Sequence, residues 1–165
     1  MWLIGMMGSG KTTVGRKAAA RVGVPFYDTD DMVVEIAHMP ISAIWEGVGE
    51  EGFRELERRA FDHVPDSGFI AAAGGGAVID ERNRAQMMKD GPVVWLRCTP
   101  ETLAARVGGD DSRPLLSSRS SPEDLLAGLL EERSALYSDT ATDVIDTDDL
   151  DVEQVVFAVI DIWER

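Results

Sequence analysis

The chain has 165 residues, of which 44% are hydrophobic, so it is long enough for one domain with a sizeable core. Its formal net charge of −14, from 16 basic and 30 acidic residues, disfavours partners such as nucleic acid and anionic membranes. No apolar run is long enough to cross a membrane, and the single cysteine, Cys98, excludes an internal disulfide. We therefore expect a monomer in the reducing cytoplasm, with Cys98 buried as a small hydrophobic residue.

The chain begins with the apolar run Met1–Ile4, which we expect to be the first strand rather than part of a signal peptide. It continues into Gly5–Thr13, which matches the complete phosphate-binding loop pattern G-x-x-x-x-G-K-[ST]. The glycines let the backbone curl so that its N–H groups converge on phosphate oxygens, and the helix predicted over Lys11–Val22 directs its positive dipole end to the same point. Because the motif occurs between a strand and a helix, a chance match is the weaker interpretation.

Side chains of this loop have separate roles in holding a nucleotide. Lys11 is placed to reach the β- and γ-phosphates, and the Thr12 hydroxyl is placed to ligate Mg²⁺. The loop residues that we expect to bind ATP are Gly8, Ser9, Gly10, Lys11, Thr12 and Thr13. The loop therefore predicts ATP as co-substrate and Mg²⁺ as cofactor.

Strands and helices alternate along the rest of the chain. We expect further strands at 24–27, 69–73, 92–97 and 143–145. Helices are expected at 31–38, 50–64, 80–89, 100–107, 121–137 and 152–163, with a short turn at 43–47. This alternation predicts an α/β, three-layer P-loop NTPase fold, with a five-stranded parallel sheet of order 2-3-1-4-5 flanked by helices. Residues 1–165 then form a single domain, with a substrate-binding region at about 30–64 and a mobile lid at about 108–121.

The acids at the ends of the predicted strands narrow the class of P-loop protein. The base-reading motif N-K-x-D of GTPases does not occur, because the only asparagine, Asn83, is not followed by lysine. Strands 69–73 and 92–97 lack the terminal acid that motor and transport ATPases usually carry. The first acids at a strand end are Asp28 and Asp30, where small-metabolite and nucleotide kinases often bind their acceptor.

Over essentially its whole length the chain resembles the shikimate kinase family. The landmarks, in the family's order, are Gly8-Ser9-Gly10-Lys11-Thr12-Thr13, Asp28-Thr29-Asp30, Phe53-Arg54-Glu55-Leu56-Glu57, Gly74-Gly75-Gly76, Arg113-Pro114-Leu115-Leu116 and Glu132-Arg133-Ser134-Ala135-Leu136-Tyr137. Each motif except the phosphate loop is weak alone, but six in order at compatible spacing are specific. The resemblance implies ATP-dependent phosphorylation of the 3-hydroxyl of shikimate, on the route to chorismate and aromatic amino acids.

The resemblance also assigns residues to the acceptor. Asp28 is expected to hold Mg²⁺ through water, and Asp30 to bind the substrate hydroxyls and to orient or deprotonate the attacking one. By its position alone, Asp30 is also compatible with a helix cap. The run Gly74-Gly75-Gly76 is expected to present backbone N–H groups to the substrate, because three glycines at a strand end are costly unless a ligand approaches closely.

Two arginines are expected to bind the substrate carboxylate. Arg54 offers a planar fork that suits this group, and Glu57, on the same helical face, can fix the rotamer of Arg54. Arg133 occurs on the inward-facing stripe of helix 121–137, which Tyr137 continues. A buried guanidinium needs an anionic partner, which is either the substrate, as the resemblance implies, or an internal carboxylate.

Two further arginines are expected near ATP. The resemblance implies that Arg113, in the lid, reaches the transferring phosphate and that Arg106 lies near the adenine. Without the resemblance, Arg113 is interpreted as an exposed loop residue. Arg58 and Arg59 are interpreted as residues of a solvated helix face.

Two other functions remain open from the residues. A gluconate-type or nucleotide kinase shares the predicted fold, and gluconate is also a carboxylate, so the two arginines do not exclude it. A kinase-like binding protein without catalysis is the other alternative, which the presence of Lys11, Thr12, Asp30 and Arg113 disfavours. A panel of acceptors with ATP distinguishes these functions.

Overall fold

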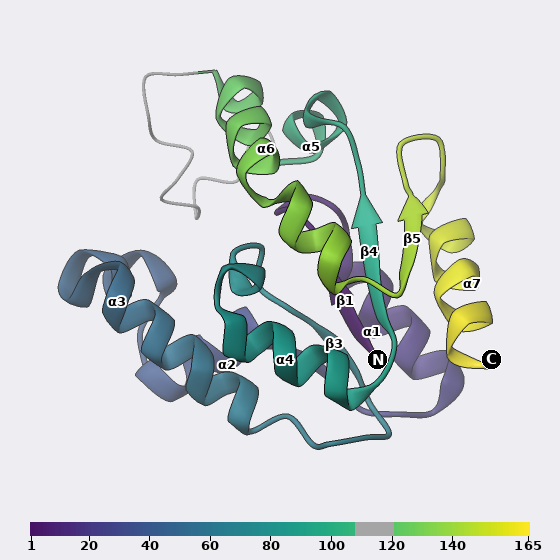
Figure 1. Cartoon of the computed structure of the whole chain (residues 1–165), viewed down its shortest axis with the longest axis horizontal. Coiled ribbons are helices and arrows are strands. Elements are labelled where there is room, and N and C mark those ends of the chain that lie inside the picture. Colours follow the sequence, from purple (N-terminus) through teal and green to yellow (C-terminus); the bar gives the residue numbers. More distant parts are fainter. Residues whose placement is uncertain (108–120) are drawn as a thin grey trace.

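The computed structural model describes residues 1–107 and 121–165, which form a parallel sheet covered by helices on both faces (Figure 1). The strands are β1 (Trp2–Ile4), β2 (Phe26–Asp28), β3 (Ile70–Ala72), β4 (Val93–Arg97) and β5 (Asp143–Asp146). Their order is β2-β3-β1-β4-β5, and every neighbouring pair is parallel. The predicted fold and strand order are confirmed, and β1 lies at the centre of the sheet.

Side chains that alternate along β1 enter two of the three hydrophobic cores that the described residues form. The helices are α1 (Lys11–Val22), α2 (Thr29–Ala37), α3 (Ile41–Asp62), α4 (Glu81–Asp90), α5 (Pro100–Val107), α6 (Pro122–Thr140) and α7 (Val152–Trp163), with a 3₁₀ turn, η1, at Ala77–Ile79. Trp2 and Ile4 lie in the core to which α3, α4, α5 and α6 contribute, whereas Leu3 lies in the core of α1 and α7. This alternation is what a central strand buried on both faces requires.

The helices between β2 and β3 differ most from the prediction. The expected turn at 43–47 and helix at 50–64 belong to one element, α3, which is kinked at Gly49 (φ 68°, ψ −168°). Glycine adopts this left-handed φ at little cost, so helix can continue on both sides of it. Helix α2 begins earlier than predicted because the Asp28 carboxylate caps it, accepting a hydrogen bond from the N–H of Asp30 at 3.0 Å.

The other boundaries lie close to the prediction. Helices α1 and α5 have the predicted ends, β2 begins only at Phe26, and α6 continues beyond Tyr137 to Thr140. Cys98, just after β4, is buried as expected. Within residues 1–107 and 121–165, none of the helices has the length and apolar character that a membrane span requires.

Candidate active site

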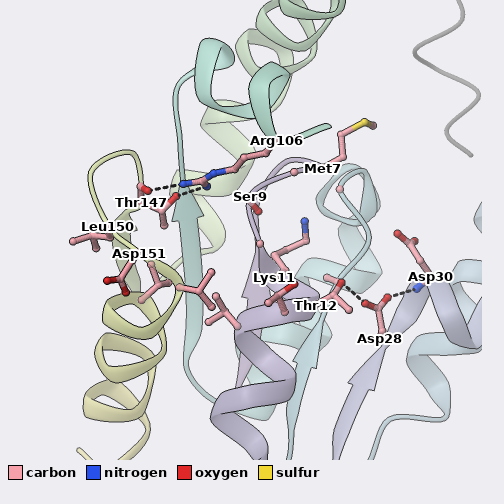
Figure 2. A pocket seen from close by; sticks show the side chains of 18 residues that line it. Met7, Ser9, Lys11, Thr12, Asp28, Asp30, Arg106, Thr147, Leu150 and Asp151 are labelled. Atoms are coloured by element: carbon pink, nitrogen blue, oxygen red, sulfur yellow. Dashed lines mark hydrogen bonds between the residues drawn. The ribbon is translucent and has the colours of Figure 1, made fainter. Parts of the chain in front are cut away.

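A cleft of about 640 Å³ opens at the carboxyl edge of the sheet, next to the loop that follows β1 (Figure 2). Its walls come from stretches that are distant in the sequence: the phosphate loop with the start of α1, the start of α2, and the loop between β5 and α7. Ala73 and Gly75, which follow β3, also line it. This is the edge at which open parallel sheets bind their ligands.

The phosphate loop has the backbone conformation that its glycines predict. Gly8 and Gly10 have left-handed φ values of 82° and 92°, and Gly10 precedes the first residue of α1. The Lys11 ammonium donates to the carbonyl oxygens of Gly5 at 2.8 Å and Met6 at 2.9 Å. The loop therefore combines the N-terminus of α1 with a lysine folded over it, an arrangement that favours phosphate oxygens.

Thr12 and Asp28 form the part of the cleft that fits a divalent cation. The Thr12 hydroxyl donates to the Asp28 carboxylate at 2.6 Å, and the other Asp28 oxygen caps α2 (Figure 2). Because Asp28 supplies the cap, the side chain of Asp30 is not the cap, and it lines the cleft. Among the residues described, no cluster of three or more His, Cys, Asp or Glu side chains could hold a metal alone. This donor set fits Mg²⁺, which is usually bound by few protein oxygens together with nucleotide phosphates and water.

Arg106 lies across the cleft from Asp28 and contacts the loop that follows β5 (Figure 2). Its guanidinium donates to the Thr147 hydroxyl at 3.1 Å and to the Thr147 carbonyl oxygen at 2.8 Å. Thr147, Leu150 and Asp151 line this end of the cleft, and sequence reasoning missed them. The available signal was their place after the carboxyl end of the last strand, which is where a parallel sheet binds ligands.

The glycine run after β3 is tightly packed against charged side chains. A Cβ atom on Gly74 would lie 2.6 Å from Oδ1 of Asp30 and 3.2 Å from Oε1 of Glu57. A Cβ atom on Gly76 would lie 2.7 Å from Nη2 of Arg54. A side chain on Gly74 or Gly76 would therefore displace Asp30 or Arg54 from its present position, and the structure brings Asp30, Arg54 and the glycine run together as one group.

The carbonyl groups of this run are used within the protein. Gly74 O accepts from the N–H of Ala77 at 2.9 Å, and Gly76 O accepts from the N–H of Ile79 at 3.0 Å. Gly75 O accepts from two side chains of α6. Within the described residues, no hydrogen bond uses the N–H groups of Gly75 and Gly76. The N–H groups of Gly75 and Gly76 are therefore available as donors, whereas that of Gly74 already donates to the Thr29 hydroxyl at 2.9 Å.

Arg54 is held by carboxylates of its own helix. Its guanidinium donates to Glu57 at 2.9 Å and lies 3.4 Å from Glu50, so Glu57 is placed to fix the rotamer as predicted. The Glu57 side chain is 1% exposed. Burial raises the pKa of Glu57 from its ordinary value of 4.5 to about 7, although the ion pair with Arg54 acts in the opposite direction.

Arg58 differs from its expected place on a solvated face. It is partly buried and forms ion pairs with Glu55 at 2.6 Å and with Asp80 at 2.9 Å. Asp80 caps α4, so Arg58 ties α3 to the segment that follows the glycine run. Arg59 is exposed, as expected.

Arg133 is buried on α6, with 8% exposure, as its place on the inward stripe predicts. Its Nη1 donates to Gly75 O at 3.2 Å, and its buried Nε has no hydrogen-bond partner. In the part of the chain that the structure describes, no carboxylate forms an ion pair with Arg133, so the alternative of an internal salt bridge has no support there. Arg113 and the predicted lid, apart from Ser121, lie outside the described residues.

Comparison with known proteins gives one family. The family model "Shikimate kinase" matches residues 7–164. A shikimate kinase from Geobacter sulfurreducens is 45% identical over 155 residues, which cover 93% of this chain and 84% of that protein. A shikimate kinase from Moorella thermoacetica is 47% identical over 147 residues, which cover 88% of this chain and 83% of that protein.

Solved structures agree in fold. A shikimate kinase from Acinetobacter baumannii in complex with shikimate superimposes with a TM-score of 0.92 at 32% identity, covering 99% of this chain and 91% of that one. A gluconokinase from Sinorhizobium meliloti has a TM-score of 0.61 at 17% identity. The similarity to the gluconokinase shows a shared fold and nothing further.

Proposed function

The chain belongs to the shikimate kinase family, and we propose that it transfers the γ-phosphoryl group of ATP to the 3-hydroxyl of shikimate. The observation that carries this proposal is the buried Arg133, whose Nε has no partner although the residue lies against Gly75 at the edge of the cleft. A buried guanidinium N–H without an acceptor is costly, and a substrate carboxylate supplies the acceptor.

The donor half of the proposed site is the phosphate loop. The ATP phosphates lie against Gly8–Thr13, with Lys11 exchanging its loop carbonyls for phosphate oxygens, and the adenine lies near Arg106. Thr12 and Asp28 would hold Mg²⁺, Asp28 through water, and the cation when bound supplies charge neutralisation between the phosphates. We assign Arg113 to the same phosphates on the family resemblance.

The acceptor half binds shikimate by its carboxylate and its hydroxyls. Arg54 and Arg133 bind the carboxylate, whose two oxygens suit two guanidinium groups. The guanidinium of Arg54 is already fixed by Glu57. The N–H groups of Gly75 and Gly76 donate to the substrate, since neither has a partner among the described residues, whereas the Gly74 N–H donates to the Thr29 hydroxyl. Asp30 accepts hydrogen bonds from the hydroxyls on the opposite side.

The reaction needs no covalent enzyme intermediate. Asp30 orients the 3-hydroxyl and receives its proton as the oxygen attacks the γ-phosphorus in line. The bond between the γ-phosphorus and the β–γ bridging oxygen breaks, and ADP leaves. Lys11 stabilises the charge that spreads over the transferring group. The enzyme so proposed is a cytoplasmic, monomeric, single-domain protein, with 30–64 as its acceptor region and 108–121 as its lid.

A coupled assay tests this function directly. ADP release is followed with ATP and Mg²⁺ in the presence of shikimate, gluconate or a nucleoside monophosphate, and the phosphorylated product is identified by mass spectrometry. We expect turnover with shikimate and at least about 100-fold lower kcat/KM with the other acceptors. Faster turnover of gluconate or a nucleotide would overturn the proposal, and calorimetric binding of ATP and shikimate without product would indicate a silent binding protein.

A further inference from the structure

We propose that Tyr137 is a positioning residue for the acceptor: its hydroxyl holds the Gly75 carbonyl, so that Arg133 can turn from this carbonyl to the substrate carboxylate. The inference rests on the proposed function, since it concerns how the same site receives its acceptor. Tyr137 does not itself contact the substrate in this scheme.

Tyr137 is fixed from several sides. It is completely buried on α6, and its ring stacks on Trp95 of β4 with the centroids 5.4 Å apart. Its hydroxyl donates to Gly75 O at 2.5 Å and lies 3.5 Å from the sulfur of Met6 in the phosphate loop. Burial raises the pKa of Tyr137 above its ordinary value, so the phenol stays protonated and remains a donor.

Gly75 O therefore has two donors from the same face of α6, Tyr137 and, one turn earlier, Arg133. The two bonds differ in quality, since the phenol bond is 2.5 Å long and the guanidinium bond is 3.2 Å long. The shorter bond suffices to satisfy the carbonyl, because a buried C=O is costly only when it has no donor. The longer bond can then be given up without leaving a buried acceptor unpaired.

This arrangement also orients the Gly76 N–H. The peptide between Gly75 and Gly76 is planar and trans, so the Gly76 N–H points away from the Gly75 carbonyl. Holding the carbonyl toward α6 therefore aims the Gly76 N–H away from α6. Without the Tyr137 hydroxyl, Arg133 would be the remaining donor to Gly75 O among the described residues, and the substrate carboxylate would compete with it.

Tyr137→Phe tests the inference, because it keeps the ring stacked on Trp95 and removes only the hydroxyl. We expect the KM for shikimate to rise about 10-fold, with the KM for ATP within about 2-fold of wild type. The matched control is Tyr27→Phe, because Tyr27 is the other tyrosine of the chain, is partly buried against Phe69, and donates no hydrogen bond in the described structure. The control should leave both KM values unchanged.

A double-mutant cycle separates positioning from a merely structural role. In an Arg133→Lys background, removing the Tyr137 hydroxyl should raise the KM for shikimate only about 2-fold, because the competition for the guanidinium has been removed. Equal effects in both backgrounds, or equal changes in the KM for ATP and for shikimate, would overturn the inference. Wild-type turnover of shikimate is measured first: if it is absent, the proposed function fails, whereas active wild type with an unchanged KM in a folded Tyr137→Phe variant removes only the role of Tyr137.

Discussion

The two halves of the proposed site are built in different ways. The phosphate site of the donor half is one contiguous stretch, Gly5–Thr13, which combines glycines of left-handed φ with one lysine. The acceptor half is drawn from α2, α3, the segment after β3, and α6. Its groups are positioned by each other: Arg54 by Glu57, and Arg133 by its contact with Gly75.

This difference separates local from tertiary determinants of function. A contiguous loop keeps its geometry wherever a strand and a helix flank it, so its chemistry depends on the identity of a few residues. A site made of four segments depends on how closely those segments pack. Substitutions in the donor half should therefore change phosphoryl transfer and leave acceptor binding intact, whereas substitutions in the acceptor half should do the reverse.

Lys11→Met should give the largest effect and tests the donor side of this comparison. The side chain loses the ammonium that stabilises the transferring phosphoryl group, so we expect kcat to fall roughly 1000-fold. Shikimate affinity in the absence of ATP should stay within about 2-fold of wild type, because Lys11 is absent from the acceptor half. Steady-state kinetics and isothermal calorimetry measure the two quantities.

If Lys11→Met loses shikimate binding together with turnover, the donor and acceptor halves are not independent. Thermal melting distinguishes this outcome from unfolding, since the variant also loses hydrogen bonds to Gly5 O and Met6 O. A folded variant that turns over at the wild-type rate would remove Lys11 from the mechanism.

Gly76→Ala tests the acceptor side. Its new Cβ would lie 2.7 Å from Nη2 of Arg54, so Arg54 must leave its present position. We expect the KM for shikimate to rise between about 10-fold and 100-fold, the range that loss of a charge-assisted hydrogen bond produces, with the KM for ATP almost unchanged.

Gly128→Ala is the matched control for this substitution. Gly128 lies on the exposed side of α6, where a Cβ atom would meet nothing within 4 Å. Alanine is the better helix former, so this variant should be slightly more stable and fully active. An equal KM in Gly76→Ala and Gly128→Ala would show that Arg54 does not depend on the space that the glycine leaves.

The same division explains how much could be predicted from the sequence. The strand order, the ends of α1 and the phosphate loop follow from periodicity and one motif, and they were predicted correctly. Glycine at positions 74–76 was predicted to admit a ligand, but the atoms that would meet a Cβ atom on Gly74 or Gly76 belong to the protein's own charged side chains.

Contacts between distant segments explain what was missed. The pairing of Arg58 with Asp80 and that of Arg106 with Thr147 join residues 22 and 41 positions apart, and neither has a signature in the sequence. The kink at Gly49 also escaped prediction, because glycine there was equally compatible with a break between two helices. Each of these features depends on distances between segments in the folded protein, and the pattern of residues along the sequence does not give those distances.

Substitution of Glu57 should have the smallest effect of these variants. Its pH dependence tests whether the acceptor half is held by charge. Its pKa is raised by burial to about 7 in the folded protein, against an ordinary value of 4.5. The folded state therefore binds the proton more tightly than the unfolded state, so the contribution of Glu57 to stability is full below pH 4.5 and is lost as the pH rises through about 7. The donor half offers no corresponding buried carboxylate among the described residues.

Glu57→Gln removes this titration and keeps the shape of the side chain. Between about pH 5 and about pH 8, the free energy of unfolding of wild type should fall by about 2–3 kcal/mol relative to that of Glu57→Gln. Urea unfolding of both proteins across this range measures the difference, and the subtraction removes the titration of all other groups. Parallel curves would mean that the ion pair with Arg54 keeps Glu57 ionised throughout. The acceptor half would then be held by charge at every pH, and the KM for shikimate should not change as the pH passes 7.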